Sequence, residues 1–153
     1  MFFQKQATPP DRTKDIALCT CANLRMATRV VTQLYDAALA PVGLKATQFT
    51  LLSTLHELGE ARLTELAEKL VMDRTTLTRN LKPLIERRLI EESGERDRRV
   101  RRLSLSTEGL RTIKEAMPHW ERIQTRTVEG LGNKSWQSLL DDLAIAVSVA
   151  QTN

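Results

Sequence analysis

LTELAEKLVMDRTTLTRNLKPLIE, residues 63–86, is the stretch that decides the fold. Apolar residues recur in it at helical spacing, so it predicts two short helices with one inward face each. Thr64 is expected to cap the first helix and Asp73 the second, with a tight break at residues 71–73 between them. Two facing helices joined by so short a connection predict a helix-turn-helix. The inward-facing residues are Leu63, Leu66, Ala67 and Leu70, then Leu77, Leu81, Leu84 and Ile85.

A β-hairpin is expected immediately after these two helices. Residues 89–92 and 100–105 form two short extended segments, and Ser93-Gly94 begins the charge-rich connection between them. In the second segment Arg101, Leu103 and Leu105 fall on one side of the strand. A hairpin behind a helix-turn-helix is a wing, so the sequence predicts a winged helix-turn-helix.

Longer helical patterns lie on both sides of this winged lobe. A first helix is expected over residues 14–40, ended by Pro41 and Gly43, and a buried central helix over residues 48–58, capped by Thr47. Beyond the hairpin, residues 106–108 open a helix that Pro118 should kink. A last helix carries its apolar stripe on Trp136, Leu140, Leu143, Val147 and Ala150.

The outer helices carry more apolar surface than one small lobe can cover. Such a stripe usually marks an interface, and most soluble oligomers are two-fold dimers. We therefore expect a homodimer and a mainly α fold with a small β-hairpin wing. The expected organisation is a flexible arm at residues 1–13 and one winged-helix domain at residues 14–153. Within that domain the winged lobe spans about 46–108, and the dimerisation helices span about 14–40 and 108–152.

Two clusters of polar and basic residues are the candidate DNA-binding sites. The first cluster lies opposite the inward leucines of the second helix, where a recognition helix presents short hydroxyls and arginines to base edges and phosphates. Its members are Arg74, Thr75, Thr76, Thr78, Arg79 and Lys82. The alternative interpretation is an ordinary solvated helix face.

The second cluster is the tip of the hairpin, RDRRVRR at residues 96–102. Arginine at this density suits a phosphate backbone and a narrow minor groove. A solubilising turn or a non-specific RNA-binding loop are the alternatives. The candidate DNA-binding residues of the wing are Arg96, Asp97, Arg98, Arg99 and Arg101, with Asp97 bracing an arginine.

The combination of these segments resembles the MarR (multiple antibiotic resistance regulator) family. The matching segments are residues 47–52, 63–67, 73–79, 84–90, 97–99 and 105–109. The resemblance implies a transcription regulator, usually a repressor, that acts as an obligate dimer on a pseudo-palindromic operator. It also implies that Asp97 and Arg99 form a salt bridge in the wing, with Arg99 reaching the minor groove. Pro83 departs from the pattern and is expected to kink only the second half of the recognition helix.

Many members of this family release DNA when a small aromatic or phenolic ligand binds. Arg25, Arg29, His56 and Trp120 are the residues that would line such a pocket here, although each also suits a core or surface position. Cys19 offers a thiol-based alternative, because its position resembles that of the sensing cysteine in the organic-hydroperoxide repressor branch. A helix N-terminus favours a thiolate, but a small buried interface cysteine is the other interpretation. No disulfide with Cys21 is expected, since residues two apart on a helix do not face each other.

Composition excludes several other classes of protein. The formal net charge is +4 with a pI of about 9.4, and no apolar run approaches the roughly 18 residues that a membrane span needs. The N-terminus is a poor signal peptide, so we expect a cytoplasmic protein. No catalytic set, phosphate loop or zinc-ligand cluster stands out, so neither an enzyme, a cofactor nor a metal is expected. The alternative to a DNA-binding regulator is a winged-helix protein-interaction module without DNA binding, although such a module has no evident need for an arginine-rich wing.

Overall fold

The computed structural model describes residues 15–94 and 101–152. Its helices are α1 (Thr20–Leu39), α2 (Ala46–Leu58), α3 (Leu63–Lys69), α4 (Arg74–Glu86), α5 (Thr107–Leu131) and α6 (Asn133–Gln151). Short 3-10 turns, η2 (Ile16–Leu18) and η3 (Ala40–Val42), come before and after α1, and the strands are β1 (Glu60–Arg62), β2 (Ile90–Gly94) and β3 (Arg101–Leu105). The expected mainly helical fold with a small wing is confirmed.

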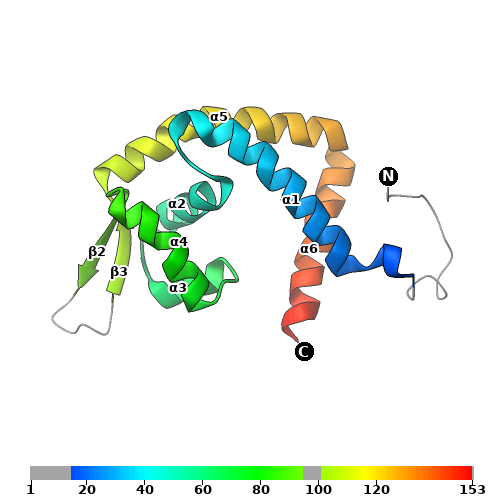
Figure 1. Cartoon of the computed structure of the whole chain (residues 1–153), viewed down its shortest axis with the longest axis horizontal. Coiled ribbons are helices and arrows are strands. Elements are labelled where there is room, and N and C mark those ends of the chain that lie inside the picture. The colour runs from blue at the N-terminus through cyan, green and yellow to red at the C-terminus, as the bar shows by residue number, and fades with distance from the viewer. Residues whose placement is uncertain (1–14, 95–100, 153) are drawn as a thin grey trace.

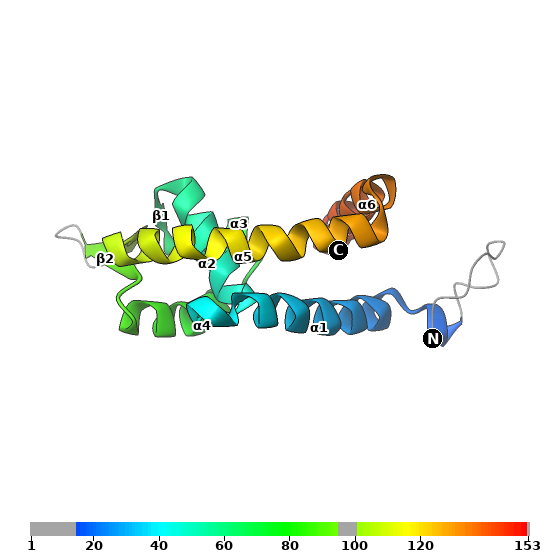
Figure 2. The same ribbon diagram turned by 90° about the horizontal axis from the view of Figure 1, so that it is seen from above.

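The helices fall into two regions along the length of the molecule. In Figures 1 and 2 the strands and α2–α4 occupy one end, whereas α6 and the start of α1 lie toward the other. Helix α5 runs along both regions and packs against α1, α2 and α6. The winged lobe is therefore joined to the outer helices mainly through α5 and α1.

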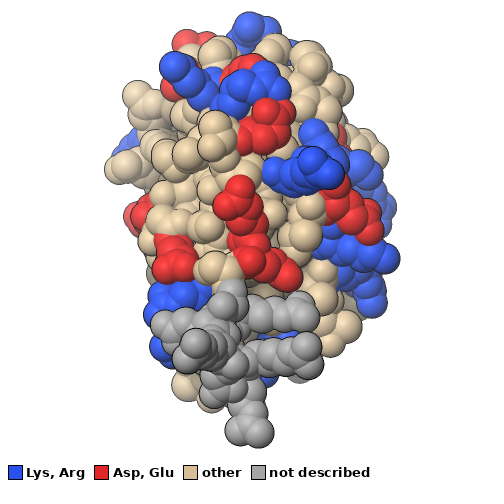
Figure 3. Space-filling view, turned by 90° about the vertical axis from the view of Figure 1, so that its left-hand side faces the viewer, with Lys and Arg blue, Asp and Glu red and all other residues tan. Residues whose placement is uncertain are grey.

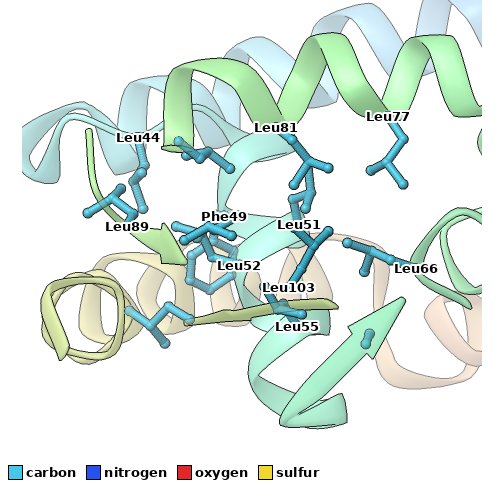
Figure 4. Packing of buried hydrophobic residues seen from close by; sticks show 14 of the residues in the cluster. Leu44, Phe49, Leu51, Leu52, Leu55, Leu66, Leu77, Leu81, Leu89 and Leu103 are labelled. Atoms are coloured by element: carbon cyan, nitrogen blue, oxygen red, sulfur yellow. The ribbon is translucent and has the colours of Figure 1, made fainter. Parts of the chain in front are cut away.

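Helix α2 lies at the centre of the winged lobe, as its apolar residues predict. Leu51, Leu52 and Leu55 are fully buried, and they meet leucines from α3, α4 and β3 in one cluster (Figure 4). Leu58, at the end of α2, is exposed instead. The partners shown in Figure 4 include Leu66, Leu77, Leu81, Leu89 and Leu103. Burial of the apolar side of α2 packs α3 and α4 against it.

The wing has three strands rather than two. The strand order is β1-β3-β2, all antiparallel, with Ala61 opposite Leu103 and Ile90 opposite Leu105. Ala61, Ile90 and Leu103 are buried on the core side of the sheet. The strand β1 was not predicted, because three residues after Gly59 are too few to show an alternating pattern.

Two helix caps were predicted wrongly. The N-cap of α2 is Lys45, not Thr47, because the Asp36 side chain of α1 accepts from the Ala46 N–H at 2.6 Å and starts the helix earlier. The N-cap of α3 is Arg62, not Thr64, since Glu65 folds back and accepts from the Arg62 N–H at 2.7 Å. By contrast, the cap predicted at Asp73 is confirmed, and a helix opens at residues 106–108 as expected, with Ser106 as its N-cap.

The bounds of the first and fifth helices also differ from expectation. Helix α1 begins at Thr20, after a 3-10 turn, and Lys14 lies outside the described residues. Cys19 is therefore the extended N-cap residue and does not belong to the helix. Helix α5 continues through Pro118 to Leu131. Pro118 is exposed, so water can reach the carbonyl that its missing N–H would have paired with.

A close contact joins the start of α5 to the segment between α4 and β2. Ser106 Oγ donates to the carbonyl oxygen of Arg88 at 2.6 Å and accepts from the Gly109 N–H at 2.9 Å. A Cβ on Gly109 would lie only 2.1 Å from the carbonyl oxygen of Leu89. Gly109 is thus required for this approach, and α5 is held tightly against the base of the wing.

Much apolar surface remains exposed on α1 and α6. The exposed residues include Leu24, Met26, Val30, Val31 and Leu34 on α1, and Leu139, Leu140, Leu143, Ile145, Val147 and Val149 on α6. None of the helices in residues 15–94 and 101–152 is long and apolar enough to cross a membrane. This surface lies away from the core cluster of the winged lobe.

Candidate nucleic-acid interface

Helix α4 presents one apolar and one polar face, as a recognition helix requires. Leu77, Leu81 and Leu84 are buried against the lobe. All six residues predicted for DNA contact on this helix are exposed, namely Arg74, Thr75, Thr76, Thr78, Arg79 and Lys82. The structure therefore brings these side chains together on the free side of α4.

The first turn of α4 is fixed by Asp73. Its carboxylate accepts from the Thr76 N–H at 2.9 Å and from the Thr76 hydroxyl at 2.6 Å. These hydrogen bonds, the side-chain one first, lower the pKa of Asp73 below its ordinary value. The Thr76 hydroxyl therefore uses its donor in the helix cap, so that this donor is not available for a hydrogen bond to DNA.

The connection before α4 contains a strained residue. Val71 has a φ of 53°, in the left-handed region that a β-branched residue rarely adopts. Its side chain is exposed. The tight break predicted at residues 71–73 is thus present, and it is closed by backbone bonds from Val71 N–H to Glu68 and from Met72 N–H to Ala67.

Lys82 lies near the end of the polar face. Its ammonium is 3.8 Å from a Glu86 carboxylate oxygen, one turn later, and both side chains are largely exposed. An exposed pair of this kind contributes little, so the lysine remains accessible to a phosphate. Helix α4 continues past Pro83 to Glu86.

The tip of the wing falls outside the described residues. Arg96, Asp97, Arg98 and Arg99 all lie there, and so does the predicted bridge between Asp97 and Arg99. The two arms that lead to the tip are described, since Gly94 of β2 pairs with Arg101 of β3. The paired strands β2 and β3, from which the tip extends, therefore lie beside α4.

A carboxylate at the base of the wing connects all three strands. Glu60 of β1 accepts from the Ser93 hydroxyl of β2 at 3.1 Å and from Arg102 Nη1 of β3 at 3.3 Å. This cluster was not predicted from the sequence, because its members are brought together only when β1 pairs with β3. It favours one orientation of the hairpin relative to the lobe.

A hollow of about 610 Å³ lies between α4 and the sheet. Its apolar lining comes from Leu63, Leu81, Ile85 and Leu103. Polar residues complete it, among them Arg74, Thr75, Thr78, Arg79, Lys82, Glu86 and Glu92. The side chains predicted to contact DNA thus border an apolar surface.

Charge is unevenly distributed at this end of the molecule. Figure 3 shows basic side chains gathered along one side and acidic side chains across the middle. The exposed cations of α4 come from Arg74, Arg79 and Lys82. A concentrated positive surface of this kind attracts polyanions.

The four residues predicted to line a ligand pocket do not form one group. Arg25 and Arg29 border the same pocket of about 600 Å³ between α1 and α6. Trp120 of α5 instead stacks on Phe49 of α2, with ring centroids 6.0 Å apart. His56 is exposed in the last turn of α2.

A larger apolar groove lies between α1, α5 and α6, and it was not predicted from the sequence. Its volume is about 1060 Å³. Tyr35 of α1 and Gln124 of α5 both line it, and the Tyr35 hydroxyl donates to the side-chain oxygen of Gln124 at 2.5 Å. The apolar lining residues are Leu18, Leu24, Ala27, Val31, Leu131, Trp136, Leu139 and Leu140. Hydrophobic stripes on all three helices were the signal that could have located it.

The two cysteines occupy different environments at the start of α1. Cys19 is half-buried as the N-cap, Cys21 is exposed, and both thiols are free. The expectation that both thiols lie on one helix was wrong, because Cys19 is extended with ψ of 115°. Asn23 donates to the carbonyl oxygen of Cys19 at 2.9 Å and holds this end of the helix.

This arrangement of a helix-turn-helix, a three-stranded wing and an exposed basic helix defines a winged helix-turn-helix protein. Comparisons with known proteins then indicate the family. The sequence model of the MarR family matches residues 44–100. No curated protein matches the chain.

The solved structures similar to this chain include DNA complexes. The transcriptional regulator MosR of M. tuberculosis in complex with DNA is 32% identical, with a TM-score of 0.81 over 88% of this chain and 97% of that one. MosR without DNA is 30% identical, with a TM-score of 0.76 over 89% and 98%. A cysteine-to-serine mutant of E. coli MarR with operator DNA shares the fold at 20% identity, with a TM-score of 0.76 over 90% and 99%.

The chain belongs to the MarR family of winged-helix transcription regulators. The resemblance inferred from the recognition helix and the wing is thereby confirmed.

Proposed function

We propose that this protein is a homodimeric repressor that binds a pseudo-palindromic operator through α4 and the wing of each protomer. The observation that carries the proposal is the exposed arginine and threonine face of α4 beside the hairpin that leads to the arginine-rich tip. Short hydroxyls and arginines on the first turns of a helix suit the major groove, and a basic hairpin suits the adjacent backbone and minor groove.

Conformation supports the same interpretation. The chain is more similar to DNA-bound MosR, with a TM-score of 0.81, than to DNA-free MosR, with 0.76. The arrangement of lobe and outer helices is thus similar to that of a relative in complex with DNA.

The apolar groove between α1, α5 and α6 supports the homodimer. Exposed leucines and valines on α1 and α6 form a surface that one protomer leaves uncovered. A second copy would bury this surface, and a two-fold axis would present two recognition helices to one duplex.

Release by a small aromatic or phenolic ligand completes the proposal. Arg25 and Arg29 border the pocket between α1 and α6, where a bound acid would find cationic partners. A ligand at this position would act on the dimerisation helices and so alter the separation of the two recognition helices.

The test is binding of the full-length chain to a duplex selected from a random library. We expect a dimer by light scattering, two half-sites in the selected sequence, and an affinity that falls steeply with salt. Arg79→Ala should bind more weakly, whereas Arg122→Ala, at an exposed position of α5, should bind as the wild type does. Binding without salt dependence, or equal loss in both variants, would contradict the proposal.

A thiol-based switch at Cys19 is the second candidate function. The observation that favours it is the half-buried thiol at the N-terminus of α1, between Leu18 and Thr20, which both line the apolar groove. An organic hydroperoxide should then release DNA from the wild type but not from Cys19→Ser. Equal release from both proteins excludes this switch.

A further inference from the structure

Two exposed threonines of α4 use their hydroxyl groups differently. The Thr78 hydroxyl donates to the carbonyl oxygen of Arg74, one turn earlier, over 2.7 Å. The Thr75 hydroxyl has no hydrogen-bond partner among residues 15–94 and 101–152. The same residue type therefore offers DNA two different chemical groups.

The hydrogen bond of Thr78 determines which atoms face outward. A threonine whose hydroxyl bonds back to its own helix is held in one side-chain rotamer. Its donor is used, and the methyl group is left to contact the surroundings. Thr78 thus presents mainly an apolar group on the polar face of α4.

The surroundings of Thr78 are apolar on one side. Thr78 borders the hollow between α4 and the sheet, together with Leu81, Ile85 and Leu103. Arg74 and Lys82 line the same hollow and supply its positive charge. An apolar group from the duplex would be better accommodated beside Thr78 than a base edge that needs a hydrogen bond.

We propose that Thr78 is a specificity-determining residue whose methyl group contacts the C5 methyl of a thymine in each half-site. The thymine methyl is the apolar feature of the major-groove edge, and threonine methyl groups are among its recognised partners. Thr75, by contrast, contributes its hydroxyl to a base edge or a phosphate. The inference rests on the proposed operator binding.

The experiment pairs two substitutions at Thr78 with a change in the DNA. Thr78→Ser keeps the hydroxyl and loses the methyl, whereas Thr78→Val keeps the methyl and loses the hydroxyl. The probe is the duplex selected by the full-length wild type, with each thymine replaced in turn by deoxyuridine, which lacks the C5 methyl. Circular dichroism and thermal unfolding establish that both variants fold.

The expected result is a coupling between one side chain and one base. Thr78→Ser should bind the selected duplex about fifteenfold more weakly, because the dimer loses a methyl contact worth about fourfold in each of its two half-sites, while Thr78→Val binds within about twofold of the wild type. One deoxyuridine in each half-site should weaken the wild type by the same factor and leave Thr78→Ser unaffected.

Thr75 supplies the matched control. Because its hydroxyl is free, Thr75→Val should weaken binding while Thr75→Ser retains it, the reverse of the pattern at Thr78. Deoxyuridine should affect both Thr75 variants as it affects the wild type.

Several outcomes would overturn the inference. The first is weaker DNA binding by Thr78→Val together with unchanged binding by Thr78→Ser. The second is that deoxyuridine at every position lowers the affinity of the wild type and of Thr78→Ser equally. The third is that deoxyuridine lowers the affinity of the wild type at no position. If the full-length chain selects no DNA sequence and binds duplex without salt dependence, the proposed function is wrong, and so is the role of Thr78 that rests on it. Specific binding without the coupling overturns only the role of Thr78.

Discussion

Arg87 Nη1 donates to the carbonyl oxygen of Gly43 over 2.8 Å. Arg87 is the C-cap residue of α4, and Gly43, with a φ of 66°, ends the 3-10 turn that follows α1. The end of the recognition helix is therefore bonded to the connection between α1 and α2. The start of α2 is bonded to α1 in turn, through Asp36 and the Ala46 N–H.

The first prediction concerns this bond. Arg87→Ala should lower the free energy of unfolding by about 1 kcal/mol, because a hydrogen bond from a charged group is lost at an exposed site. It should also weaken binding to the selected duplex severalfold, since α4 loses its link to the connection between α1 and α2. Arg87→Lys, which keeps one charged donor, should restore part of both quantities. Unchanged binding by Arg87→Ala would mean that the bond does not orient α4.

The second prediction concerns the tip of the wing. Arg99→Ala should weaken binding to the selected duplex by about 1–3 kcal/mol, because the proposed interface uses this arginine in the minor groove. Thermal unfolding should be unchanged, which separates this effect from loss of the fold. Affinity equal to that of the wild type would remove the wing tip from the interface.

The third prediction concerns the cap of the recognition helix. The pKa of Asp73 is lowered in the folded chain by its bonds to Thr76, so its ionised form stabilises the fold above the unfolded pKa of about 4. That contribution is lost as the pH falls through the lower folded pKa. Asp73→Asn should therefore reduce the melting temperature at pH 7 and converge with the wild type in acid. A constant difference across the pH range would contradict this assignment.

The fourth prediction concerns two glycines of α5. Gly109→Ala should destabilise the protein by about 1–3 kcal/mol, since the added Cβ would lie 2.1 Å from the Leu89 carbonyl oxygen. Gly130→Ala, in the same helix with open space around the site, should instead stabilise by about 0.4–1 kcal/mol. Chemical denaturation of both variants measures the contrast, and similar values for the two would show that the Gly109 contact yields readily.

The sequence predicts the parts of this fold that local pattern determines. The helix-turn-helix follows from leucines at helical spacing on both sides of a short break, and the cap at Asp73 follows from residue type alone. The polar face of α4 follows from the same spacing, since residues opposite buried leucines must be exposed.

What pattern does not reveal depends on contacts between distant segments. The strand β1 forms because Glu60, Ala61 and Arg62 pair with residues 102–104. Helices α3 and α4 and the strand β2 separate these two segments in the sequence. The earlier start of α2 likewise depends on Asp36 of another helix. The difference in hydrogen bonding between the Thr75 and Thr78 hydroxyls can be recognised only from atomic positions, because both residues are exposed threonines of one helix face.

The unbroken course of α5 past Pro118 has a consequence for the choice of operator. At the rise of an α-helix this element is about 37 Å long, close to the 34–36 Å between successive major grooves on one face of DNA. Gly109 and Ser106 fix one end of α5 to Arg88 and Leu89, the residues that lead into β2 of the wing. A pivot of only about 5° at the far end displaces the wing by about 3 Å, nearly the rise of one base pair. A dimer built on two such helices would therefore adapt to a change of one base pair in half-site spacing through a small pivot at the far ends of α5.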